Sequence, residues 1–179
     1  MPSPVSSPGL DPPGVEAQMQ KPVSFTVLGL TLSGTLPFVL SAFTFFWPDT
    51  ASTFIGAGTF EREQVQSASR SSLIVYAVAI LSFMTGIRWG GELQAPRGAI
   101  RPSVMILAVL PALIAWVAGL MSVIGFEPAQ LPLLVLSASF VLLLIWDLTA
   151  GYASWYVGLR CFATLMAAGS LAIAAFIAP

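Results

Sequence analysis

Long runs without a single charged side chain set the strongest limit on how this chain can fold. The first run lies between Lys21 and Asp49, and four further apolar segments follow, separated by short polar stretches. Only 8% of the 179 residues are charged, whereas a typical soluble domain has about 25%. Because so few charges cannot cover a surface exposed to water, the sequence indicates that lipid surrounds most of the protein.

The apolar segments have the length of membrane-spanning helices, since about 20 helical residues cross a hydrocarbon core of about 30 Å. We therefore predict an all-α fold, a polytopic helical bundle with five transmembrane helices. The predicted spans cover about residues 25–46, 72–91, 103–124, 131–148 and 159–178. They form one transmembrane domain, residues 23–179, after a disordered tail rich in proline and serine at residues 1–22.

The basic residues predict which way the bundle is oriented. Five spans place the termini on opposite sides, with Lys21, Arg88, Arg97, Arg101 and Arg160 on the N-terminal side, and Arg62 and Arg70 on the other. This excess predicts an N-terminus inside. The tail has neither the basic start and apolar run of a signal peptide nor the arginines of a mitochondrial transit peptide. We expect a bacterial cytoplasmic (inner) membrane protein, with the mitochondrial inner membrane as the alternative.

Four charged residues are predicted to meet at the inner interface: Arg88, Glu92, Asp147 and Arg160. Asp147 ends the fourth span and Arg160 begins the fifth, so each opposes its helix dipole by about 0.3–1 kcal/mol. A direct ion pair between them would offset both penalties. Arg88 has Glu92 one helical turn later and is also within reach of Asp147. This candidate polar cluster is either a structural lock or a site for a ligand, a lipid headgroup or a partner.

Small residues and prolines carry further predictions about the helices. Gly86 and Gly90 have the GxxxG spacing that is typical of close helix packing in membranes. Pro37 and Pro111 fall inside the first and third spans, where each is expected to kink its helix. A kink can be purely structural or can line a cavity.

The residue types of common catalytic chemistry are scarce. The chain has no histidine and one cysteine, Cys161. We therefore predict no catalytic, cofactor-binding or metal-binding residues and no cofactor, and we expect that the protein is not an enzyme. The net charge of −1 argues against nucleic-acid binding, which requires a basic patch.

These observations leave three classes of function. The leading hypothesis is a non-enzymatic structural or accessory component of the membrane, whose partners are the lipid bilayer and a larger membrane complex or further copies of itself. The alternative is a small solute transporter or channel that acts as a homo-oligomer. A membrane enzyme is the third, although no pair of nucleophile and base is visible.

Five segments occur in an order typical of one family: GTLPFVLSA, YAVAILSFMTGIRWG, VLPALIAWVAGL, LLIWDLTA and WYVGLRCFATL. Together they resemble the transmembrane protein 69 family, small multi-span proteins of bacteria and mitochondria without an established function. The resemblance covers roughly Val27 to Ser170. SFMTGIRWG is its most specific part, with Met84 and Thr85 in place of the expected Leu-Gly. It implies a five-span inner-membrane protein, a bacterial one given the tail, and no catalytic residues.

Overall fold

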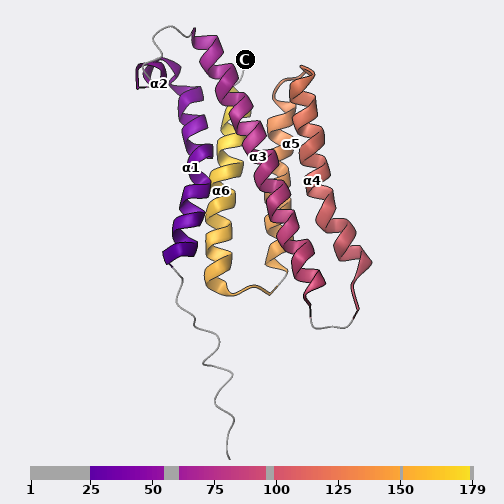
Figure 1. Ribbon diagram of the computed structural model, residues 1–179. Helices are drawn as coiled ribbons and strands as arrows, with labels where there is room; N and C mark the ends of the chain where they lie inside the picture. Colours follow the sequence, from indigo (N-terminus) through magenta and orange to yellow (C-terminus); the bar gives the residue numbers. More distant parts are fainter. Residues whose placement is uncertain (1–24, 55–60, 96–98, 150, 178–179) are drawn as a thin grey trace, which may run out of the picture.

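The computed structural model describes residues 25–54, 61–95, 99–149 and 151–177, and the predicted tail at 1–22 lies outside this part of the chain. The described residues form helices and no strand (Figure 1). The helices are α1 (Phe25–Phe46), α2 (Pro48–Phe54), α3 (Arg62–Leu93), α4 (Pro102–Val123), α5 (Leu131–Leu148) and α6 (Ser154–Ile177). All except α2 are long and apolar enough to cross a membrane, which confirms the predicted all-α fold with five spans.

The five long helices form a closed ring. Each packs against its neighbours in the order α1, α3, α4, α5, α6 and back to α1, while α3 also contacts α5 and α6 across the ring. Figure 1 shows these helices side by side, with successive helices running in opposite directions. One end of the bundle therefore gathers the starts of α1, α4 and α6 and the ends of α3 and α5.

The segment between the first two spans is more helical than expected. The predicted spans leave residues 47–71 between them, but α2 occupies Pro48–Phe54 and α3 already begins at Arg62. The 32 residues of α3 are longer than the roughly 20 that a bilayer requires. Its first turns therefore lie outside the membrane. They begin at a cap where the Gln64 side chain accepts a hydrogen bond from the Glu61 amide (3.3 Å).

Aromatic rings fill the middle of the bundle. The Phe38 ring packs edge-on against Tyr76 and Phe140, with centroid distances of 5.0 and 5.7 Å. Buried leucines and alanines of α3, α5 and α6 complete this core around them: Leu73, Ala77, Leu81, Leu133, Leu136, Leu143, Ala167 and Leu171. The centre of the ring is thus packed with apolar side chains.

Hydroxyl groups join α1 to α3 at the end of the bundle that carries α2, here called the α2 end. Ser41 Oγ lies 3.1 Å from Ser72 Oγ, and Thr44 Oγ1 lies 2.7 Å from Ser69 Oγ. Nearer the middle, the Tyr76 hydroxyl donates to the Gly34 carbonyl (2.9 Å). Figure 1 shows α3 running obliquely away from α1 beyond these contacts.

The close helix approach occurs at another glycine than predicted. A Cβ built on Gly86 or Gly90 would have no neighbour within 4 Å, so no described helix of this chain packs on that face, and the Gly86/Gly90 packing face stays a prediction. No helix comes close there because α3 exposes Gly86 on its surface. Instead, a Cβ on Gly119 would meet Val78 Cγ2 at 3.3 Å, beside the buried Ala115 and Ala118 of α4.

Both prolines lie inside continuous helices. Pro37 is within α1 and Pro111 within α4, and each helix continues past its proline. The kink predicted at each position stays a prediction.

Candidate functional site

Asp147 is the centre of a buried charge cluster. It lies in the last turn of α5, and its carboxylate faces Arg88 from α3 and Arg160 from α6. Arg88 Nε is 3.4 Å from Asp147 Oδ1, while Arg160 Nη2 forms a close ion pair with Oδ2. The three side chains are 12%, 3% and 10% exposed for Arg88, Asp147 and Arg160. One carboxylate therefore links three helices at the end of the bundle opposite α2, here called the charged end.

The helix dipoles explain why Asp147 and Arg160 meet. The carboxylate lies at the negative end of α5, and Arg160 lies in the second turn of α6, near its positive end. Each charge alone is unfavourable at its position, and the short α5–α6 connection brings the two together. The pair offsets both penalties.

Arg88 is held by an aromatic ring as well as by charge. Its guanidinium carbon lies 4.1 Å from the Trp146 ring centroid and 6.0 Å from that of Tyr152. Its Nη2 donates to the Trp146 carbonyl (3.2 Å). Stacking on an aromatic face suits a delocalised cation in a poorly hydrated place. Arg88 is thus held beside the last turn of α5.

The cluster is not electrically balanced. Two guanidinium groups share one carboxylate, so Arg88, Asp147 and Arg160 together carry one net positive charge. The 3.4 Å contact between Arg88 and Asp147 permits attraction but lacks hydrogen-bond geometry, and Nε of Arg160 has no hydrogen-bond partner among the described residues. A buried donor without a partner and an uncompensated charge both favour an anion or acceptor nearby.

Glu92 lies close to this cluster and pairs with Arg101, an arginine that the sequence did not suggest as its partner. Its carboxylate accepts hydrogen bonds from Arg101 Nε (3.0 Å), Nη2 (2.8 Å) and the Arg101 amide (3.0 Å). Because Arg101 caps α4, the carboxylate lies at the positive end of that helix. Arg88, Glu92 and Arg101 border one cavity of about 300 Å³. The candidate site therefore consists of the three-residue cluster and the neighbouring ion pair between Glu92 and Arg101.

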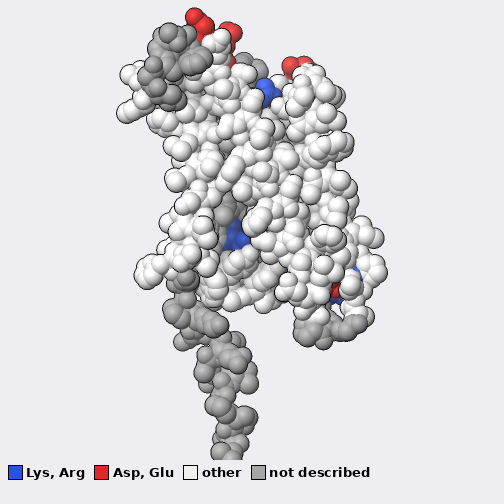
Figure 2. Space-filling view, viewed as in Figure 1, with Lys and Arg blue, Asp and Glu red and all other residues white. Residues whose placement is uncertain are grey.

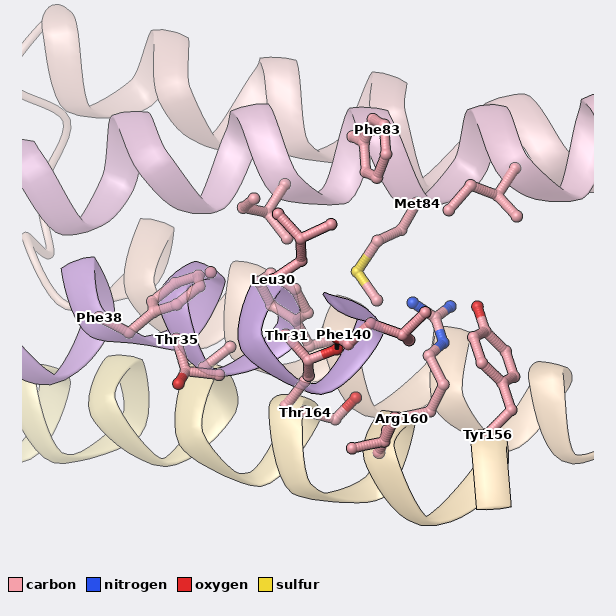
Figure 3. Close-up of a pocket in the computed structure, with 17 residues that line it drawn as sticks. Leu30, Thr31, Thr35, Phe38, Phe83, Met84, Phe140, Tyr156, Arg160 and Thr164 are labelled. Atoms are coloured by element: carbon pink, nitrogen blue, oxygen red, sulfur yellow. Dashed lines mark hydrogen bonds between the residues drawn. The ribbon is translucent and has the colours of Figure 1, made fainter. Parts of the chain in front are cut away.

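A second, larger cavity opens beside Arg160. It has a volume of about 440 Å³ and lies between α1, α3 and α6, with Phe140 of α5 at its inner end. Figure 2 shows blue basic atoms recessed in a hollow of this face, and Arg160 is the basic residue that lines the cavity. Figure 3 shows the polar ends of Arg160 and Tyr156 directed toward the helix that carries Phe83 and Met84. The rest of the lining is mostly apolar.

Sequence reasoning missed the second cavity. Tyr156, Thr31 and Thr164, which line it, were not among the predicted site residues. Tyr156, Arg160, Ala163, Thr164 and Ala167 follow one another at spacings of one, three and four residues. That spacing identifies one face of a helix. An arginine on such a face, otherwise made of small and aromatic residues, was the signal available.

The described residues contain no group of three or more His, Cys, Asp or Glu side chains placed to hold a metal ion. Cys161 is half-buried on α6 and has no disulfide partner.

The fold and the buried charge cluster define a class: an all-α, multi-pass membrane protein with an ion-paired interhelical site. The chain belongs to the DUF3429 family, a family of proteins of unknown function, which matches residues 23–176. Comparison with curated proteins gives no match, and comparison with solved structures gives none either.

Proposed function

We propose that this protein is a non-enzymatic structural or accessory component of its membrane. The observation that carries the proposal is that buried ion pairs join neighbouring helices. Asp147 ties together α3, α5 and α6, and Glu92 ties the end of α3 to the start of α4. Such pairs fix the arrangement of helices in lipid, where an unpaired charge is costly.

The transporter or channel hypothesis has less support. A path through one bundle would need free polar groups at the middle of the membrane, but the hydroxyls of Tyr76 and Ser139, beside Phe38 and Phe140, donate to backbone carbonyls. Packed aromatic and aliphatic side chains at this level do not hydrate an ion or a polar solute. A pathway between copies in a homo-oligomer would have to form on the outer faces of the helices.

The orientation and the membrane are part of the proposal. Arg88, Arg101 and Arg160 lie at the charged end, and Arg62 and Arg70 lie on the first turns of α3 at the α2 end. The positive-inside rule then places the charged end, and the start of α1, on the cytoplasmic side. We infer a bacterial cytoplasmic membrane, with the mitochondrial inner membrane as the alternative; the resemblance to the transmembrane protein 69 family is compatible with both.

The test is affinity purification at native expression level in mild detergent, followed by native gel electrophoresis and mass spectrometry. Stoichiometric recovery with one membrane complex supports an accessory subunit. Recovery only as a monomer or homo-oligomer, with solute flux in liposomes that Asp147→Asn abolishes, overturns the proposal in favour of transport.

The orientation has its own test. Reporter fusions that are active on only one side of the membrane are placed after Val123 and after Leu148. The proposal expects the first fusion point outside and the second inside, and the reverse result overturns the assigned orientation.

A further inference from the structure

The cavity beside Arg160 has the form of a site for an amphiphilic molecule. Its volume of about 440 Å³ is within the roughly 300–1,000 Å³ of typical ligand sites. It extends along α1 from Val27 to Phe38, which corresponds to about 16 Å of helix. One elongated cavity thus reaches from the charged end to the aromatic centre of the bundle.

The polarity of the lining changes along this length. Arg160 and Tyr156 lie at the charged end, Phe38 closes the opposite end, and Phe140 lies between them (Figure 3). The hydroxyls of Thr31 and Thr35 donate to carbonyls of their own helix, at 2.9 and 2.8 Å, so they add little free polarity. A molecule that fits has a polar head near the membrane interface and an apolar tail directed toward the bilayer centre.

The charge of the head follows from the cluster around Arg160. This side chain is about nine-tenths buried, its Nε has no partner among the described residues, and its ion-paired group carries one net positive charge. Asp147 from α5, which also contacts Arg88 of α3, faces it, and Tyr156 from its own helix lies beside it. A single negative charge at this position neutralises the cluster and accepts the free donor.

The route into the cavity is lateral. The hollow lies between α1 and α3 on the face of the bundle that meets lipid (Figure 2). At the charged end of the cavity α1 offers no charged group, and the hydroxyl contacts that join it to α3 lie farther along, at Gly34 and at the α2 end. A lipid can therefore enter from one leaflet without crossing the bundle.

We propose that this cavity binds an anionic lipid, with its acidic head on Arg160 and Tyr156 and one acyl chain between α1, α3 and α6. The shared chemistry is a carboxylate or phosphate on an acyl chain, and the source is either a membrane phospholipid or a free fatty acid. The proposal is independent of whether the protein is an accessory subunit.

The experiment is native mass spectrometry of the purified full chain with added lipids: phosphatidylglycerol, oleate and, as a zwitterionic control, phosphatidylcholine. We expect one bound anionic lipid per chain and at least about tenfold weaker retention of phosphatidylcholine. Preference for phosphatidylglycerol identifies a phospholipid, and preference for oleate identifies a free fatty acid. Equal retention of all three overturns the proposal.

Two variants separate binding from folding. Arg160→Gln removes the head contact but also breaks the ion pair with Asp147, so it can lower stability. Ala163→Phe fills the cavity and leaves every described ion pair in place. Its matched control is Ala138→Phe, on an exposed position of α5 that borders none of the cavities described above.

We expect Ala163→Phe to abolish the one-to-one lipid complex at an unchanged melting temperature, and Ala138→Phe to retain it. Unchanged lipid retention in Ala163→Phe overturns the proposal. So does a wild-type dimer that Ala163→Phe dissociates without any change in bound lipid, because the cavity would then receive a second copy of the chain.

Discussion

The two ends of the bundle hold the same helices together by different chemistry. At the charged end, Asp147 joins α3, α5 and α6 through two arginines that are almost completely buried. At the α2 end, hydroxyl groups pair α1 with α3, and the ion pair between Arg62 and Asp49 is fully open to solvent, with side chains 63% and 71% exposed. α1 takes part in the hydroxyl contacts but in none of the buried ion pairs.

This difference shows how a membrane bundle can be rigid at one place and open at another. Hydroxyl pairs between spanning helices contribute about 0.6 kcal/mol each on average, and they need the two backbones to be close. Long arginine side chains bridge a wider gap, but their burial requires a partner. The α1–α3 seam is therefore closed at the α2 end, and the cavity opens toward the charged end, beyond the Tyr76–Gly34 hydrogen bond.

The largest effect that distinguishes the two ends is expected from Asp147→Asn. The substitution keeps the shape but leaves Arg88 and Arg160 as two buried cations without a counter-charge. We expect a loss of about 3–5 kcal/mol in the free energy of unfolding, measured by thermal or denaturant unfolding in detergent.

The control for Asp147→Asn is Asp49→Asn at the α2 end, where water solvates the released arginine. The double variant Asp147→Asn/Arg160→Gln should recover part of the loss, because one of the two unpaired cations is removed. Equal stability of Asp147→Asn and Asp49→Asn would mean that the charged end is not a lock.

Much of the fold could be predicted because charges and prolines mark the limits of the apolar runs. α1 and α5 have the bounds given for the first and fourth spans, and α4 begins one residue earlier than its span. The start of α3 differed by ten residues, since hydropathy detects the membrane segment and not the polar turns that continue the helix beyond it. The seven-residue α2 has too few residues for a periodic pattern.

The site could be predicted only in part, for a reason visible at Glu92. The opposed dipoles of two consecutive helices suggest the Asp147–Arg160 pair from sequence alone. Helical spacing places Glu92 near Arg88, but it does not reveal that Arg88 stacks on Trp146 or that Glu92 pairs with Arg101. Which arginine a carboxylate reaches depends on the relative register of α3, α4 and α5. The cavity also depends on how the helices are placed relative to one another, because its lining comes from four helices. It could therefore not be predicted from the sequence.

The second prediction compares two glycines. Gly119 of α4 packs closely against α3, whereas Gly86 of α3 has no close neighbour. A side chain at Gly119 would push against Val78, whereas Gly86, near the charged end, has open space around it. We expect Gly119→Leu to lower the free energy of unfolding by about 1–3 kcal/mol. Gly86→Leu is the matched control and should be neutral or stabilising by up to about 1 kcal/mol. A destabilising Gly86→Leu would reveal a helix partner at that face.

The third prediction measures the hydroxyl seam itself. Ser69→Ala removes the 2.7 Å contact with Thr44, and the expected loss is about 0.6–1 kcal/mol. Ser82→Ala is the control, because that exposed hydroxyl bonds only to the Val78 carbonyl of its own helix. If both variants unfold alike, the α1–α3 seam is held by apolar packing and not by hydroxyl pairs.

The smallest effect is expected at the exposed ion pair of the α2 end. The hydrogen bond from Arg62 lowers the pKa of Asp49 below its ordinary value of 3.8. A lowered folded-state pKa means that the ion pair stabilises fully above about pH 3.8 and that this stabilisation is lost as the pH falls through the lowered pKa. Because the ion pair is exposed, Asp49→Asn should lower the free energy of unfolding by less than Ser69→Ala does at neutral pH. It should vanish in acid and fade in about 1 M salt, where charges on the surface are screened. A difference that survives both treatments would show that Asp49 stabilises α2 by something other than its charge. The exposed pair at Asp49 and the buried cluster at Asp147 would then differ only in how much they stabilise the protein.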